Sequence, residues 1–219
     1  MTLLDFARGP ALYAATLIMV CGLVWRLTGV ALLPFRRDLA ASGPNAKGRV
    51  SGALWQVVSR SFPRRSFLGR TMVTVTIGYA MHIGLAVILL GGAPHILLVT
   101  QATGLDWPAL PKGIVAIASG VTLVSLLLVI LRRLTHPVLR LLSNVDDYLS
   151  ILLTLIPVLT GILLAEETLL PYETLLTWHI LSVEALMIWL PFGKLAHVVF
   201  VFAGRAALGA RQARKGALQ

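Results

Sequence analysis

Histidine is the residue type in this sequence whose placement could do the most chemistry. Four of the 5 histidines, His82, His95, His179 and His197, fall inside long apolar stretches. Ionisable side chains are costly in hydrocarbon and usually serve a purpose there, and a neutral imidazole is a good metal ligand. His179 and His197 are 18 residues apart, which is five turns of an α-helix and a rise of about 27 Å. They would share one helix face yet be too far apart for one metal ion, so each needs a partner from another helix.

The stretches that carry these histidines have the composition of membrane-spanning helices. The chain has 219 residues, 57% hydrophobic and 13% charged, with a mean hydropathy of +0.85. Soluble domains are about 45–50% apolar and about 25% charged, so a soluble domain and a disordered chain are excluded. The single cysteine, Cys21, excludes an internal disulfide framework.

Five stretches are long enough for a span of about 20 residues. They cover residues 10–35, 71–100, 113–131, 148–165 and 175–203. The backbone of a span must satisfy its own hydrogen bonds, and no strand-like alternation is seen. We therefore expect an all-α membrane protein, one domain over residues 1–219 built as a bundle of five helices.

The positive charges are sorted among the connecting segments. Lys and Arg gather in the 36–70 loop, after the third stretch and after the fifth, whereas the other connections hold Lys112 and four acids. By the positive-inside rule the N-terminus lies outside and the C-terminus in the cytoplasm. The net charge of +10 is then mainly a topology signal. Anionic lipid headgroups are its expected partner, and no nucleic-acid-binding module accompanies it.

The 36–70 loop is the longest soluble segment. Trp55, Val57, Val58 and Phe62 are interleaved there with polar residues. This pattern predicts a short interfacial helix with Trp55 at the level of the headgroups. The loop is also the natural surface for a cytoplasmic partner.

The predicted topology makes the second and fifth stretches antiparallel. His82 then lies opposite His197, and His95 opposite His179. Two imidazoles on two helices of a bundle are typical of haem b, whose iron takes one ligand from each side. Zinc fits less well, because it prefers four ligands and no cysteine or carboxylate is near in sequence. A single membrane histidine would more simply bond a neighbouring carbonyl, but two antiparallel pairs favour two haem b groups.

Glycines precede three of these histidines by four residues: Gly78, Gly91 and Gly193. Positions i and i+4 share a helix face, so a missing side chain there would let a flat porphyrin approach the backbone. The same glycines could instead serve helix–helix packing.

The second stretch departs from simple helical pairing. His82 and His95 are 13 residues apart, so an ideal helix would point them about 140° apart. Pro94 should kink or end the helix between them. Either the kink realigns His95, or His95 lies beyond the helix end.

Taken in order, these features resemble the γ subunit of respiratory nitrate reductase, a membrane dihaem cytochrome b. The motifs that carry the resemblance are His82-Ile83-Gly84, LRRLTHP at 131–137, Asp147-Tyr148, and His179 followed by LPFGKLAH at 190–197. In that family the second histidine of the helix follows the first more closely, and Gly92 stands at that place here. The outer site is thus either shifted and built on His95, or lost.

The resemblance implies an electron-transfer subunit rather than a complete enzyme. His82 and His197 would hold an inner haem, and His95 and His179 an outer one. Quinol from the membrane would be oxidised near the outer haem. Electrons would pass to iron–sulfur and catalytic subunits in the cytoplasm, across the inner membrane of a bacterium or archaeon. Cytochromes linked to sulfite reduction or heterodisulfide-reductase-like complexes are also compatible.

Few other polar groups are candidates for this chemistry. Lys112 could bond a quinone oxygen or be a simple interfacial lysine, and Glu184 could relay protons or bond a histidine nitrogen. Cytoplasmic arginines could pair with haem propionates or only set topology: Arg132, Arg133 and Arg140. His136, in the same loop, is expected to be solvated.

Two other classes of protein remain open. One is a haem-free membrane anchor whose histidines bond neighbouring groups. The other is a small transporter, since Pro94, Pro157 and Pro191 interrupt apolar stretches, although no internal repeat is visible.

Overall fold

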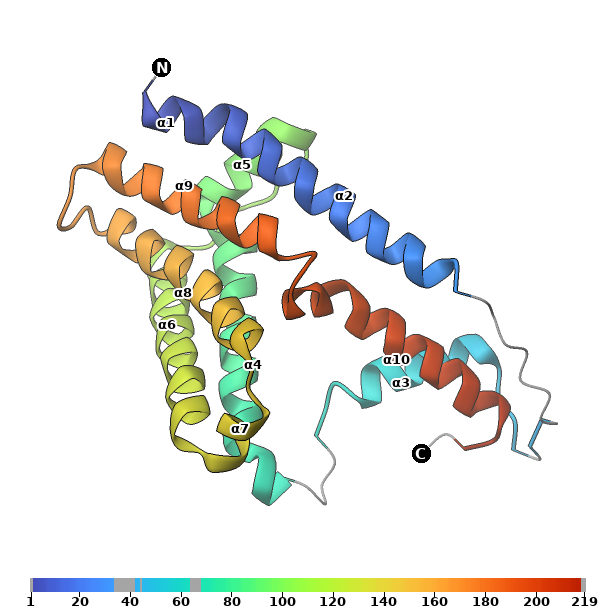
Figure 1. Cartoon of the computed structure of the whole chain (residues 1–219). Coiled ribbons are helices and arrows are strands. Elements are labelled where there is room, and N and C mark those ends of the chain that lie inside the picture. The colour runs from blue at the N-terminus through green and yellow to red at the C-terminus, as the bar shows by residue number, and fades with distance from the viewer. Residues whose placement is uncertain (1, 34–41, 44, 64–67, 218–219) are drawn as a thin grey trace. The chain divides into compact units, whose positions relative to one another are not determined.

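Helices make up all the regular structure in the described part of the chain (Figure 1). The computed structural model describes residues 2–33, 42, 43, 45–63 and 68–217. The elements are α1 (Leu3–Phe6), the π-helix η1 (Ala7–Ala11), α2 (Leu12–Ala31), α3 (Arg49–Ser59), α4 (Leu68–Gly91), α5 (Ala93–Thr103), α6 (Lys112–Thr135), α7 (Pro137–Leu142), α8 (Val145–Ala165), α9 (Tyr172–Trp189), the 3-10 helix η3 (Lys194–Ala196) and α10 (His197–Arg214).

Four of these helical stretches are long and apolar enough to cross a membrane. They are Leu3–Ala31, Thr71–Gly91, Lys112–Thr135 and Val145–Ala165, and the broken pair α9 and η3–α10 makes a fifth if it counts as one span. Within an 18-residue apolar window of each of the four unbroken spans, only 6% to 17% of the residues are buried inside the protein. Apolar side chains exposed to this extent need lipid around them. The all-α membrane architecture predicted from composition is therefore confirmed.

The last apolar stretch is not one continuous helix, as its predicted span over 175–203 required. Helix α9 ends at Trp189, and α10 begins at His197. Pro191 lacks an N–H and its ring clashes with the preceding turn, and Gly193 is extended at φ −94°, ψ −172°. The argument that placed His179 and His197 on one face of one helix is therefore wrong.

The second apolar stretch is also divided. Helix α4 ends at Gly91, Gly92 is extended at φ −74°, ψ 121°, and Pro94 lies in the first turn of α5. Proline is well tolerated at that position because the N–H it lacks would have no intrahelical partner. The alternative in which His95 lies beyond the helix end is thus the correct one.

The chain forms two compact units. The first contains Met1–Met19 and Met72–Trp189, and the second contains Val20–Thr71 and Leu190–Gln219. In the first unit α8 packs against both α6 and α9 (Figure 1). Helices α4 and α6 meet at Gly84, where a Cβ atom would collide with Thr122.

Two arginines at the end of α6 link it to other parts of the first unit. The guanidinium of Arg133 lies 3.2 Å from the Asp147 carboxylate and donates to Ser143 at 2.8 Å. Arg132 donates to Thr74 of α4 at 3.1 Å. His136, between α6 and α7, is exposed as expected.

The second unit is built around α10. Helix α3, which confirms the helix predicted around Trp55, packs against α10 through Gly52 and Gly209. On α2, a Cβ at Gly22 would lie 2.8 Å from the ring of Pro191. The bare backbone of Gly22 thus leaves room for the break between α9 and α10.

Candidate functional site

His95 and His179 lie side by side in the first unit. His95 is in the first turn of α5 and His179 is in the middle of α9. Their ring centroids are 6.2 Å apart and the ring planes are inclined by 40°. Both side chains are half-buried. The structure therefore brings together one of the two predicted histidine pairs, whose members are 84 residues apart in sequence.

Each of these two rings is held through its Nδ1 atom. Nδ1 of His95 lies 2.9 Å from the carbonyl oxygen of Ile88, in the last turn of α4. Nδ1 of His179 lies 3.1 Å from the carbonyl oxygen of Pro157 and 3.2 Å from the Thr160 hydroxyl. A carbonyl oxygen only accepts, so Nδ1 carries the proton in both rings. The Nε2 atom then has the lone pair that a metal would bind.

The end of α4 is closed by the segment that follows it. Trp107 donates from Nε1 to the carbonyl oxygen of Leu90 at 2.6 Å. The backbone N–H of Leu110 donates to the carbonyl oxygen of Gly91 at 2.9 Å. The last carbonyls of a helix have no partner within the helix. Together with the bond from His95 to the Ile88 carbonyl, the loop after α5 therefore satisfies the end of α4 and holds the backbone just before His95 in place.

Two glycines leave room for the rings. A Cβ at Gly92 would lie 3.0 Å from Nδ1 of His95, and a Cβ at Gly161 in α8 would lie 3.1 Å from Cε1 of His179. Both rings thus pack on bare backbone. Sequence spacing did not point to these two glycines, because Gly161 faces a ring from a different helix.

The glycines that spacing did select have other surroundings. No described atom lies within 4 Å of a Cβ built at Gly78. At Gly91 that Cβ would meet the side chain of Leu110, and the helix ends before His95. Gly193 is buried in the break before α10. A role for them in packing a porphyrin stays a prediction.

His82 and His197 are also held through Nδ1, each by its own segment. Nδ1 of His82 lies 2.7 Å from the carbonyl oxygen of Gly78, one turn earlier in α4. Nδ1 of His197 lies 2.9 Å from that of Lys194 in η3. His82 belongs to the first unit and His197 to the second, so their pairing stays a prediction. The protonated Nδ1 is common to all four membrane histidines.

The two predicted quinol-site residues differ in environment. Glu184 in α9 is only 4% exposed, and its Oε1 has no hydrogen-bond partner among the described residues. Lys112, the first residue of α6, is exposed. A buried carboxyl oxygen without a partner is costly, so Glu184 is the more unusual of the two.

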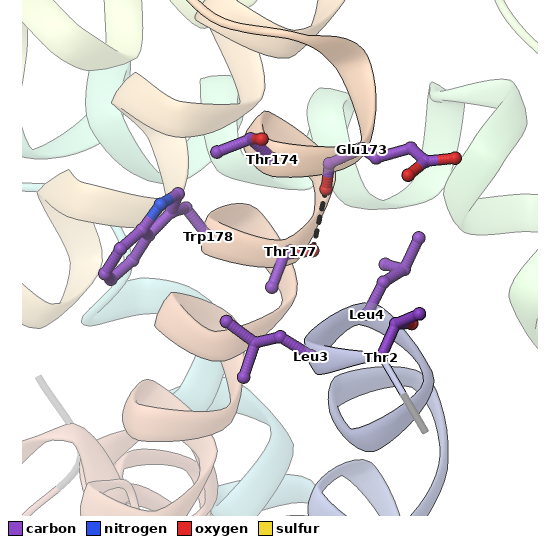
Figure 2. Close-up of a pocket in the computed structure, with 7 residues that line it drawn as sticks. All are labelled: Thr2, Leu3, Leu4, Glu173, Thr174, Thr177 and Trp178. Atoms are coloured by element: carbon purple, nitrogen blue, oxygen red, sulfur yellow. Dashed lines mark hydrogen bonds between the residues drawn. The ribbon is translucent and has the colours of Figure 1, made fainter.

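A shallow pocket lies where α1 meets the first part of α9, and its lining extends to Trp178, directly before His179 (Figure 2). Its volume is about 200 Å³. Within it the Thr177 hydroxyl donates to the backbone oxygen of Glu173 at 2.7 Å. The lining residues are Thr2, Leu3, Leu4, Glu173, Thr174, Thr177 and Trp178. Neither Lys112 nor Glu184 lines this pocket. Of its lining, only the acid Glu173, just before an apolar stretch, stood out in the sequence.

Comparison with known proteins adds one relative. No family model matches the chain, and no solved structure matches it. A protein of Nitratidesulfovibrio vulgaris strain Hildenborough is 29% identical over 209 residues, which cover 93% of this chain and 91% of the relative. Its name, "Protein", states no activity. The likeness nevertheless runs through nearly the whole of both chains.

Proposed function

We propose that this chain is the membrane subunit of a quinol-linked electron-transfer complex and binds two haem b groups. The observation that carries the proposal is the pairing of His95 and His179. The two rings come from different helices and their centroids are 6.2 Å apart. Two neighbouring imidazoles of this kind could together hold one haem iron.

The surroundings of the pair also suit haem iron. In bis-histidine cytochromes each ligand is oriented by a hydrogen bond from its other ring nitrogen, which also raises its basicity. The carbonyl oxygens of Ile88 and Pro157 accept those bonds here. In the described part of the chain no three His, Cys, Asp or Glu side chains gather around one point. Two protein ligands are enough for an iron whose other four ligands come from a porphyrin.

When bound, haem b supplies a one-electron redox centre within the membrane. His95 and His179 would hold the outer group through Nε2, and His82 and His197 the inner one. His95 and His179 are both half-buried residues. Burial and hydrogen bonding of such ligands are levers on redox potential.

The orientation proposed here follows the charges. With α9 and α10 counted as one broken span, the positive-inside rule puts the N-terminus outside and the C-terminus in the cytoplasm. The pair of His95 and His179 then lies toward the outer face. A cytoplasmic iron–sulfur subunit is the proposed partner, in the inner membrane of a bacterium or archaeon.

Quinol oxidation needs groups that take up protons. The buried Oε1 of Glu184 has no hydrogen-bond partner among the described residues. It could therefore take up a proton or accept a hydrogen bond from a quinol hydroxyl. Lys112 would donate to a quinone oxygen at the outer surface. Both assignments rest on the proposed quinol chemistry.

A haem-free membrane anchor is the second candidate. The observation that favours it is that the same Nδ1 bonds to backbone carbonyls would satisfy a purely structural histidine. The two candidates differ in whether Nε2 of each ring binds iron.

The test is the haem content of the full-length protein purified from haem-replete cells. We expect a reduced b-type absorption band and about two haems per chain. His179→Ala should lose one haem and keep the other, whereas His136→Ala, at the exposed histidine between α6 and α7, should keep both. A colourless wild-type protein would overturn the haem proposal and leave a haem-free membrane protein, such as the anchor.

A further inference from the structure

Helix α3 presents its apolar side outward. Val50, Leu54 and Val58, spaced four residues apart along one line, are 74%, 64% and 57% exposed. The residues on the opposite side, Gly52 and Gln56, are buried. A helix on a water-soluble protein shows the reverse arrangement. The outward side of α3 therefore requires an apolar environment that the described chain does not provide.

Packing against α10 fixes this orientation. A Cβ at Gly52 would collide with Ala213, and one at Gly209 would collide with the backbone of Gly52. The backbone N–H of Lys47 also donates to the carbonyl oxygen of Ala213 at 2.9 Å. Only glycine allows two helices to approach so closely. Rotation of α3 to bury Val50 and Leu54 would bring larger side chains into that contact.

The other end of the helix pair is fixed as well. Arg205 of α10 donates from its guanidinium to the Ser61 hydroxyl at 3.2 Å. Phe62, just beyond α3, is 69% exposed and extends the apolar line, and Trp55 beside it is 53% exposed. We use the name α3 outer face for Val50, Leu54, Trp55, Val58 and Phe62.

The charges around the α3 outer face have one sign. Apart from Asp38, which lies outside the described residues, the segments 20–71 and 190–219 contain no Asp or Glu. The exposed basic residues on α3 and directly beside it are Lys47, Arg49 and Arg60, and they form the rim of this face. An apolar helix face combined with a rim of Arg and Lys is the pattern of helices that lie in the surface of an anionic membrane.

We propose that the α3 outer face is seated in the anionic lipid surface of the membrane that the chain itself spans. The apolar side chains enter the boundary between headgroups and acyl chains, and the basic rim binds lipid phosphates. Helix α3 packs on α10, which is part of the broken fifth span, so its own unit brings this face close to lipid. A separate protein partner would have to displace that lipid. This proposal does not rest on haem binding.

The test uses the full chain in lipid vesicles. Cys21 is the single cysteine, so a Cys21→Ser background allows one nitroxide label at Leu54→Cys. The matched control is Arg211→Cys, on an exposed position about 200° around α10 from Gly209. Both positions belong to the same helix pair, but they lie on opposite sides of it.

In vesicles with anionic phosphatidylglycerol, oxygen should relax the Leu54 label several times more than a water-soluble nickel chelate does. The Arg211 label should show the reverse preference. Nickel access at Leu54 should rise when all lipid is zwitterionic phosphatidylcholine. Val58→Cys gives a second reading of the same line of residues.

Two results would overturn the proposal. If nickel reaches Leu54 and Val58 as readily as Arg211 in both kinds of vesicle, the face is open to water and suits a cytoplasmic protein partner. If the Leu54 label contacts lipid equally in both, the recognition of anionic headgroups is wrong.

Discussion

Arg26, in the middle of α2, donates a hydrogen bond of 2.8 Å from its guanidinium to the carbonyl oxygen of Pro191. The same guanidinium lies 5.0 Å from the centre of the Phe200 ring. Pro191 belongs to the non-helical break before α10, where a carbonyl has no helical partner. A charged residue inside an apolar span thus satisfies a break in another segment, and Gly22, one turn earlier on α2, leaves room for the proline ring.

Replacement of Arg26 by methionine should destabilise the second unit. It removes a hydrogen bond from a charged donor, worth about 1.5–3 kcal/mol, and leaves the Pro191 carbonyl without its partner. We expect the thermal unfolding midpoint in detergent to fall by roughly 2–4 °C for each kcal/mol lost. Arg8→Met, at an exposed arginine of η1, is the control and should leave the midpoint nearly unchanged. Equal midpoints for both variants would show that the Arg26 bond contributes nothing.

Substitution of Gly161 should act on His179 alone. Alanine would place a Cβ 3.1 Å from Cε1 of His179, so the ring must shift by a few tenths of an ångström, and valine should displace it. We expect Gly161→Ala to shift the absorption or EPR signal of the outer haem and Gly161→Val to abolish that haem. The control is Gly120→Ala in α6, where no described atom lies within 4 Å of the new Cβ. An unchanged outer-haem signal in Gly161→Val would contradict the proposed ligand.

Asp147 should matter more to stability than its partner Arg133. Its side chain is 8% exposed, and it accepts both from Arg133 and from the backbone N–H of Asn144 as part of a capping box. Asp147→Ala removes the hydrogen bond from the Asn144 N–H to a charged acceptor, worth about 1.5–3 kcal/mol, in addition to the ion pair. Asp147→Ala should therefore lower the unfolding midpoint further than Arg133→Ala, with a non-additive double variant. Arg140→Ala, at an exposed position, is the control; additive effects would show that the pair is not coupled.

The helices that run through lipid were predictable, because a long apolar run is itself the signal. The stretches 113–131 and 148–165 correspond to α6 and α8. Proline was a poorer guide. Pro157 lies inside the unbroken α8, whereas Pro191, followed closely by Gly193, coincides with a break. The effect of a membrane proline depends on what the neighbouring segments offer its backbone, and this information is not local in sequence.

The candidate site was predictable only in part. Two histidines in apolar stretches that were predicted to be antiparallel indicated that His95 and His179 would lie close together. The structure does bring them together. The residues that orient them could not be found by spacing, since Pro157 and Gly161 act on a ring from another helix. The pairing of Arg133 with Asp147 was missed for the same reason: such contacts depend on helix rotation, which apolar composition leaves undetermined.

The remaining histidines provide the sharpest test of the two-haem proposal. If His82 and His197 bind the same iron, then His82→Ala and His197→Ala should each remove the same haem. Each single variant would leave only one of the two side chains that we propose hold this group. The variant lacking both histidines should therefore lose no more haem than either single variant.

The loss of haem from the single and double variants is measured by haem content and redox titration of the purified proteins. Far-UV circular dichroism establishes that each variant is folded. His136→Ala again serves as the control. Because the Nδ1 atoms of His82 and His197 are bonded within their own segments, loss of one ring should not disturb the orientation of the other. The outer haem, which we propose is held by His95 and His179, should keep its potential in all three variants. If the two single variants lost different haems, or if their losses added in the double variant, His82 and His197 would belong to separate sites.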